Sequence, residues 1–218
     1  MRPFAVALAL LALSSCREIT PVESLTAISG YQLDGTVTTK DGRPLDSVAV
    51  RVNYFYQLTQ QTPLDTVRVR VGDSAHAITI GVYTPDGRRV RTIYSGHLPP
   101  GWFPRYTWDE KDDSGAFAPS GKYLMRYTEA GAVVKTVPWL ADGHPTALTN
   151  VAGQFTLRGG QIPAGEVFDL YYYDGRYDGT YLVLPKVHLV FNRGALWGLG
   201  DEVALRKDVV SRGSFIVE

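Results

Sequence analysis

The chain has 218 residues, of which 44% are hydrophobic and 20% are charged, and its formal net charge at pH 7 is zero. This balance supplies no basic excess to neutralise a nucleic-acid backbone, so we expect no nucleic-acid partner. The 22 glycines and 13 tyrosines favour short strands and frequent turns over long helices, and the single cysteine excludes an internal disulfide.

The N-terminus has the order of a secretory signal. A basic residue, Arg2, precedes an apolar run from Phe4 to Leu13, and small residues then lead to Cys16. The run is shorter than the roughly 20 apolar residues that span a bilayer. We therefore predict that residues 1–15 are a signal peptide, which is removed and takes no part in the fold.

Leu13, Ser14, Ser15 and Cys16 resemble a bacterial lipobox. The resemblance implies cleavage before Cys16, lipid on its thiol, and hence the membrane as a partner, since two or more acyl chains anchor stably. Arg17, not an aspartate, follows the cysteine, and by resemblance to Gram-negative lipoproteins this favours the outer membrane. The protein would face the periplasm or the cell surface. The alternative is an ordinary signal peptide with an incidental cysteine.

Period-two alternation predicts strands from residue 31 onward, after a tether over residues 16–30. The expected buried faces are Val48, Val50, Val52, Tyr54 and Tyr56; Val67, Val69 and Val71; Ile78, Ile80 and Val82; Tyr123, Met125 and Tyr127; and Val187, Leu189 and Phe191. Asp-Gly and Ser-Gly turns separate these runs, and no long stretch keeps a 3.6-residue period. We predict an all-β protein built from two sandwiches.

The middle of the chain resembles the Ig-like domain of the flagellar hook-capping family, often called FlgD-like. The matching elements are Ile78 to Tyr83, Asp86-Gly87, Val90-Arg91, Gly101-Trp102, Trp108-Asp109, Asp112 to Gly115 and Ser120 to Tyr123. These positions also have structural roles. Gly87 permits a positive φ in a tight hairpin, Trp108 is a large core anchor, and none is a catalytic group.

The flanks resemble the carboxypeptidase regulatory-like, or transthyretin-like, sandwich. The matching elements are Gly35-Thr36-Val37, Asp41 to Leu45, Val48-Ala49-Val50, Thr149, Gly153, and Phe155-Thr156-Leu157, followed by IPAGEVFDL and DEVALRKD. The first and second halves of this pattern lie about a hundred residues apart. Loop tips accept inserted domains when their ends are close, so we infer that the FlgD-like module is inserted in a loop of this sandwich.

The predicted organisation follows from these two resemblances. The discontinuous sandwich covers 31–60 and 146–209, the FlgD-like domain covers 61–145, and residues 210–218 form a C-terminal tail. The alternative is three sequential β modules without nesting.

No motif predicts an enzyme, a metal site or a cofactor. His76, His97, His144 and His188 are scattered, and no zinc-peptidase signature, nucleophile elbow or phosphate loop is present. Asp109, Glu110, Asp112 and Asp113 lack the spacing of a calcium loop, and Lys111 interrupts them. We interpret this acidic run as a solvated turn and expect a non-enzymatic protein.

A tyrosine-rich stretch, YYYDGRYDGTY, is the one candidate ligand site. Tyr171, Tyr173 and Tyr177 would give rigid contact area with a polar tip, which suits a glycan or protein partner. Under the alternative interpretation this is an ordinary hairpin, in which Tyr172 packs inward with Phe168 and the neighbouring tyrosines point outward.

These features favour a lipid-anchored, non-enzymatic envelope or cell-surface protein that acts as a structural or interaction module. One alternative is a glycan-binding or adhesive lipoprotein that uses the tyrosine-rich hairpin. Another is an accessory subunit of an envelope hydrolase or secretion system. Modules similar to the FlgD-like one direct export from a C-terminal position, whereas here more than 70 residues follow it. The oligomeric state stays open.

Overall fold

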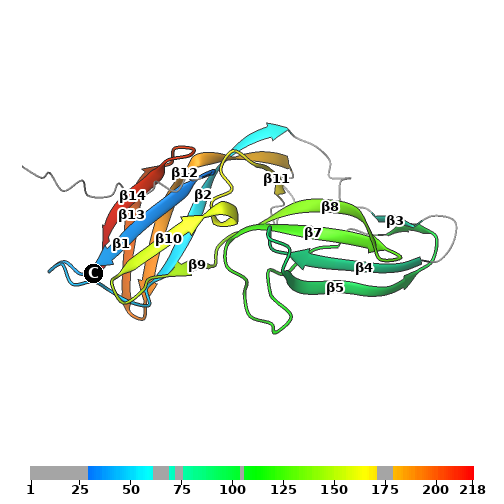
Figure 1. The fold of residues 1–218 in the computed structure, drawn as a ribbon, viewed down its shortest axis with the longest axis horizontal. Coiled ribbons are helices and arrows are strands. Elements are labelled where there is room, and N and C mark those ends of the chain that lie inside the picture. The colour runs from blue at the N-terminus through cyan, green and yellow to red at the C-terminus, as the bar shows by residue number, and fades with distance from the viewer. Residues whose placement is uncertain (1–28, 61–68, 72–75, 104–105, 171–178) are drawn as a thin grey trace, which may run out of the picture.

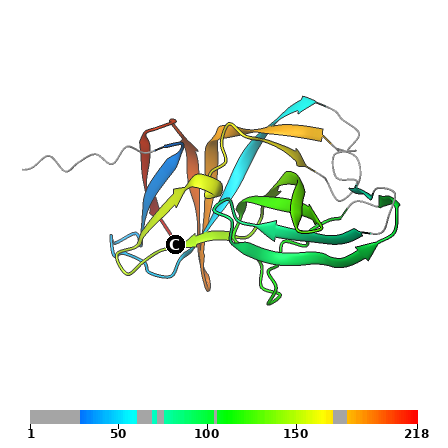
Figure 2. The same cartoon turned by 45° about the vertical axis from the view of Figure 1, so that its right-hand side comes forward.

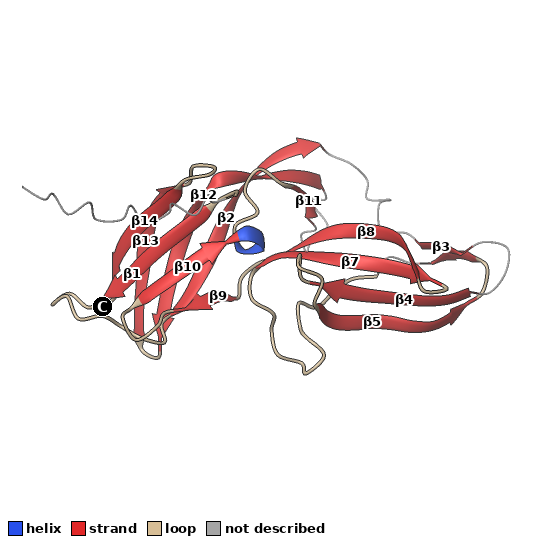
Figure 3. Cartoon of the chain, viewed as in Figure 1, coloured by secondary structure: helices blue, strands red, loops and turns tan. Residues whose placement is uncertain are grey.

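A computed structural model describes residues 29–60, 69–71, 76–103, 106–170 and 179–218. Within these ranges the chain forms strands and one short 3-10 helix, η1 (Gly159–Gln161), so the fold is all-β, as predicted (Figure 3). Among the described residues, no helix is long and apolar enough to cross a membrane. The strands form two units with separate hydrophobic cores, which lie end to end along the long axis (Figure 1).

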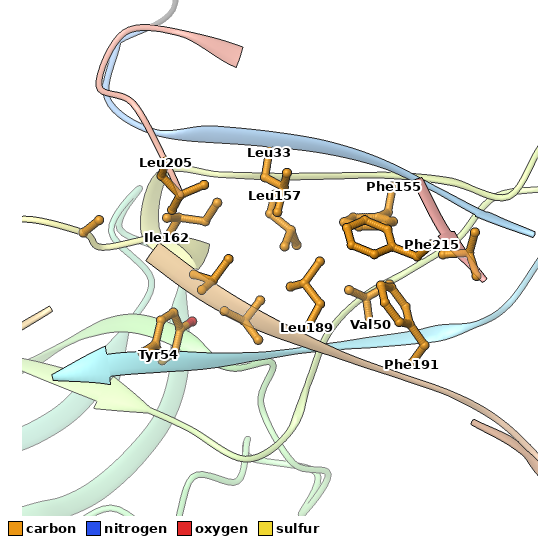
Figure 4. Close-up of a cluster of buried hydrophobic side chains, with 14 of the residues drawn as sticks. Leu33, Val50, Tyr54, Phe155, Leu157, Ile162, Leu189, Phe191, Leu205 and Phe215 are labelled. Carbon is orange, nitrogen blue, oxygen red and sulfur yellow. The ribbon is translucent and has the colours of Figure 1, made fainter. Parts of the chain in front are cut away.

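The framework unit comprises residues 29–60 and 145–218. Its strands are β1 (Gln32–Thr38), β2 (Ala49–Gln60), β9 (Pro145–Leu148), β10 (Gln154–Arg158), β11 (Val167–Leu170), β12 (Gly179–Arg193), β13 (Leu196–Ala204) and β14 (Val210–Ile216). One sheet has the order β10-β1-β14. The other has the order β11-β12-β2-β9, with β13 also paired to β12. The two sheets bury the core between them (Figure 4).

Three phenylalanines close one end of the framework core. Phe191 is fully buried, and its ring centroid lies 4.8 Å from that of Phe215 and 6.1 Å from that of Phe155. The sheet leaves space for two of these rings at glycines: a Cβ on Gly35 would lie 2.1 Å from Phe155 Cζ, and one on Gly213 would lie 2.5 Å from Phe215 Cζ. Aromatic rings thus occupy the places that side chains on those strands would fill.

The inserted unit comprises residues 69–141. Its strands are β3 (Val69–Val71), β4 (His76–Tyr83), β5 (Arg89–Leu98), β6 (Gly101–Phe103), β7 (Gly121–Glu129) and β8 (Ala132–Ala141). A four-stranded sheet has the order β5-β4-β7-β8, and β3 pairs with β6. The Trp108 and Tyr123 rings meet edge-on at 4.8 Å in its core, and Trp108 is 4% exposed, as its predicted role as a core anchor requires.

The predicted buried faces agree with the structure wherever side chains are described. Only Tyr56 among them is half-buried rather than buried. The buried members are Val48, Val50, Val52, Tyr54, Ile78, Ile80, Val82, Tyr123, Met125, Tyr127, Val187, Leu189 and Phe191. The side chains of Val67, Val69 and Val71 lie outside the described part of the chain.

The C-terminal segment corrects one prediction. Residues 210–218 were expected to be a tail outside the sandwich, but Val210–Ile216 forms β14, which pairs in parallel with β1 from Gln32↔Val210 to Thr38↔Ile216. Phe215 and Val217 point into the core. The segment contains only two large inward residues and a glycine, so its alternation is too short to predict a strand from sequence.

Candidate functional site

The two units meet where β8 leads through Asp142-Gly143-His144 into β9, and this junction is the candidate site (Figure 2). Two hydrogen bonds stabilise the connection between β8 and β9. Ser120 Oγ donates to the His144 carbonyl at 2.7 Å, and the His144 N–H donates back to Ser120 Oγ at 2.9 Å. Ser120 is only 1% exposed, so both bonds are shielded from water.

Two glycines let the backbones of the units approach closely. A Cβ on Gly121, whose φ is +147°, would lie 2.8 Å from the carbonyl oxygen of Gly160 in η1. A Cβ on Gly160 would lie 2.9 Å from Pro85 Cγ. Next to this contact, the Lys122 ammonium donates to the Glu166 carboxylate, which adds a partly buried ion pair between the units. These contacts fix how the inserted unit sits on the framework.

Two carboxylates lie at the same junction: Glu110 belongs to the inserted unit, and Asp142 to the connection between β8 and β9. Tyr56 Oη, on β2 of the framework, donates to Asp142 Oδ2 at 2.6 Å. Glu110 Oε2 lies 3.2 Å from His144 Nε2, and its backbone has a φ of +59°. Burial, together with the nearby Asp142 charge, raises the pKa of Glu110 to about 7. This carboxyl therefore takes up a proton at a higher pH than an exposed glutamate does.

The pKa of His144 is shifted in the opposite direction to that of Glu110. Burial, and then the Arg51 charge, lowers the pKa of the His144 imidazole, although Asp142 acts against this. Its ring stacks on Phe117, with centroids 4.2 Å apart and planes at 22°. The imidazole is therefore neutral at pH 7, and the Glu110–His144 contact is not a full ion pair there. Chemically, the junction combines a carboxyl of raised pKa, an imidazole of lowered pKa and a tyrosine hydroxyl that donates to a carboxylate.

A cleft of about 220 Å³ opens beside these residues at the end of β11. Its lining combines carboxylates with aromatic and aliphatic side chains. The lining residues are Tyr56, Glu110, Trp139, Leu140, Asp142, Asp169 and Leu170. They come from β2, β8, β11 and the connections beside them, and the sequence interpretation did not identify them as a site. The available signals were the Asp142-Gly143 turn and the acidic run that contains Glu110.

The predicted site residues fall outside the described part of the chain. Cys16 and its lipobox neighbours Leu13, Ser14 and Ser15 lie there, as do Tyr171, Tyr173 and Tyr177. The lipidation site and the tyrosine-rich ligand site therefore remain predictions from the sequence. From the same tyrosine-rich stretch, Tyr181 is described: it is half-buried, and its ring meets that of Tyr56 at 6.4 Å.

In the acidic run the carboxylates diverge. Asp112 Oδ1 accepts hydrogen bonds from the Ser114 and Ala116 N–H groups, which closes a turn. Asp113 Oδ1 accepts from the Thr92 N–H at 3.0 Å, and Asp109 lies 3.4 Å from Arg91. These carboxylates shape the local backbone. Among the described residues, no three histidine, cysteine, aspartate or glutamate side chains converge as metal ligands.

The comparisons with known proteins identify one region. Residues 55–132 match the family model described as the FlgD Ig-like domain. The match begins within β2 of the framework and covers β3 to β7 of the inserted unit. Searches of curated proteins and of solved structures return no match. This chain therefore carries, over residues 55–132, a region similar to the FlgD Ig-like domain.

Proposed function

We propose that the protein is a lipid-anchored, non-enzymatic envelope module that presents its FlgD-like Ig domain at a fixed orientation. The junction is the observation that carries this proposal. The inserted unit is attached to the framework by the Ser120–His144 bonds, the Lys122–Glu166 pair and the Tyr56–Asp142 bond. Several contacts fix the inserted unit, in addition to the two chain connections that join it to the framework. Such a fixed domain suits a spacer or a docking element better than a hinged one.

The polar groups of the junction support a structural role. The Ser120 hydroxyl bonds both the backbone carbonyl and the backbone N–H of His144. The Tyr54 hydroxyl donates to the Gln161 carbonyl at 3.0 Å. Burial and the Asp142 charge raise the pKa of Tyr54, so its hydroxyl stays protonated and serves as a donor. Groups bound in this way stabilise packing.

The N-terminal sequence supports the anchor. The lipobox-like Leu13-Ser14-Ser15-Cys16 lies 14 residues before Gly30, where the framework unit begins with a bond from the Gly30 N–H to Asp208 Oδ1. A lipid on Cys16 would hold the framework end towards the outer membrane, and the inserted unit at the far end would be presented to a partner protein.

Lipid labelling and fractionation test the anchor. The native chain should incorporate radiolabelled palmitate and sediment with outer membranes, whereas Cys16→Ser should lose the label and leave the membrane fraction. Membrane retention of an unlabelled Cys16→Ser would contradict the lipid anchor.

A protease that cannot cross the outer membrane then locates the units in intact cells. Cleavage of a C-terminal tag before lysis would indicate surface display, and cleavage only after lysis would indicate a periplasmic module. Crosslinking in cells tests the proposed interaction and should capture a partner protein bound to the inserted unit. A chain that lacks residues 69–141 should no longer capture that partner.

A further inference from the structure

The outer face of the β10-β1-β14 sheet carries a regular array of short polar side chains. The register places Asp34 beside Thr156 on one side and Arg212 on the other, and it places Thr36 between Gln154 and Ser214. The two rows of three form what we call the polar grid. Its members are Asp34, Thr36, Gln154, Thr156, Arg212 and Ser214.

A concave groove of about 470 Å³ lies over the polar grid. This volume falls within the range of roughly 300–1,000 Å³ that is common for small-molecule sites. The groove also exposes backbone at Gly35 and Gly213, since Phe155 and Phe215 occupy only the inner face of the sheet. Backbone groups are therefore accessible between the side chains.

Most of the grid side chains have unused hydrogen-bonding capacity. Asp34 Oδ1 accepts from Thr156 Oγ1 at 2.9 Å and from Gln32 Nε2 at 3.0 Å. Across the described part of the chain, the Thr36, Gln154, Arg212 and Ser214 side chains make no hydrogen bond or ion pair.

The outer face of the inserted unit differs. There, the Arg126 guanidinium lies 4.7 Å from the Tyr83 ring centre, and Thr128 Oγ1 donates to the Thr79 carbonyl at 3.1 Å. That sheet uses its polar groups internally, whereas the polar grid presents them outward.

We propose that the polar grid binds a neutral oligosaccharide. Each sugar hydroxyl is both a donor and an acceptor, and the grid offers both functions on neighbouring strands. Asp34 accepts, Arg212 donates, and the hydroxyls and the amide do either. Asp34 and Arg212 are register partners of opposite charge, so the grid has no net formal charge and an uncharged ligand fits better than an anion or a cation.

The spacing of the grid sets the size of the ligand. Neighbouring strands are about 4.8 Å apart and alternate residues along a strand about 6.7 Å apart, so the six side chains cover roughly 10 by 7 Å. This footprint suits one or two sugar rings. None of the six grid side chains is an aromatic ring that could stack on the sugar, so the dissociation constant is expected on the order of 10⁻⁴ to 10⁻³ M.

Sugar binding at the polar grid would depend neither on the membrane anchor nor on the presented domain. It also places glycan contact on the described sheet, not on the tyrosine-rich hairpin. A failure of the anchor experiment would leave it unaffected.

The test is calorimetric titration of the full chain in detergent with three neutral disaccharides: maltose, cellobiose and chitobiose. At least one should bind, and its dissociation constant should stay constant as salt is raised. The double variant Asp34→Asn/Arg212→Gln, which removes both charges and shortens the side chain at 212, should weaken binding at least about tenfold. The matched control Thr79→Ala/Ser95→Ala, on the outer face of the other unit, should bind as the native chain does.

Sedimentation with insoluble starch, cellulose and chitin distinguishes a soluble sugar from a neutral polymer as the source of the ligand. The proposal is overturned if none of these sugars or polymers binds at about 10 mM sugar equivalents. It is also overturned if the Asp34/Arg212 variant binds normally while retaining its native unfolding temperature. Loss of binding in Tyr171→Ala/Tyr173→Ala, but not in the grid variant, would assign the site to the hairpin instead.

Discussion

The two units bury their cores in different ways. The framework core joins strands that are distant in sequence, with β1 pairing to β10 at Gln32↔Arg158 and to β14 at Gln32↔Val210. The inserted unit pairs near neighbours through the β4–β5 and β7–β8 hairpins. Local pairing loses less loop-closure entropy than distant pairing. We therefore expect the framework to form only when segments that are distant in the sequence have come together.

Their aromatic residues differ as well. One end of the framework core is closed by three phenylalanines without polar atoms, two of them packed over glycines. The inserted unit uses Trp108 and Tyr123, whose Nε1–H and hydroxyl donate to the Lys111 and Pro119 carbonyls at 2.7 Å each. Burial raises the pKa of Tyr123 to about 12, so it stays a donor. The phenylalanine cluster relies on shape alone, whereas the Trp108–Tyr123 pair combines packing with directed hydrogen bonds.

The largest expected effect comes from Phe191→Ala. Removing this fully buried ring from between Phe155 and Phe215 should cost roughly 3–5 kcal/mol of unfolding free energy. Hydrogen exchange should show lost protection in framework peptides first, with the inserted unit retained. Leu199→Ala, at a position 58% exposed on the same sheet, is the control and should change little. Equal loss of protection in both units would show that they unfold as one.

The junction glycine gives the next effect. In Gly121→Ala the new Cβ would meet the Gly160 carbonyl at 2.8 Å, and φ is +147°, so we expect a loss of about 2–3 kcal/mol in urea unfolding. Gly115→Ala is the matched control, because its φ is +86° but no atom lies within 4 Å. The two variants share backbone strain, and only the first has the collision. Equal losses would mean that close approach at the junction contributes nothing.

Glu110 makes the junction pH-dependent. Its pKa rises from 4.5 to about 7 on folding, so the native state binds the proton more tightly than the unfolded chain does. The free energy of unfolding should therefore fall as pH rises from about 4.5 to about 7, and should stay low above that. Glu110→Gln should remove this fall and gain about 2 kcal/mol at pH 8 over the native chain.

Thermal or urea unfolding from pH 4 to pH 9 measures this effect. Asp109→Asn, an exposed carboxylate in the same segment, is the control and should keep the native pH profile. A Glu110→Gln variant whose profile overlays that of the native chain would refute the assignment of the pH dependence to the junction.

The smallest effect is expected for Tyr56→Phe, which removes the 2.6 Å hydrogen bond to Asp142 and keeps the ring. The expected loss is about 1 kcal/mol, together with faster exchange of the amides around Asp142. Tyr94→Phe serves as control, because the Tyr94 hydroxyl donates at 3.3 Å to His97 within a single unit. If both variants behave alike, the bond between the units is no stronger than a local surface contact.

The sequence predicted the strands whose side chains alternate strongly. Val48 to Tyr54 on β2 and Val187 to Phe191 on β12 needed only their period to be placed on a buried face. The region similar to the FlgD Ig-like domain was also predicted, and the family match confirms it. β14 was missed, because its glycine and small polar residues leave Phe215 as the one large buried side chain within the strand. Its strand state depends on pairing with β1.

The junction and the polar grid could not be predicted for a related reason. Tyr56 and Asp142 are 86 positions apart, and Asp34 and Thr156 are 122 apart, so no local pattern connects them. Alternation and turn residues act within a few residues of one another, which is why the sequence by itself determined an all-β chain with known inward faces. Strand order, register and the approach of the two units depend on long-range packing. Only the tertiary structure decided which polar side chains share a surface.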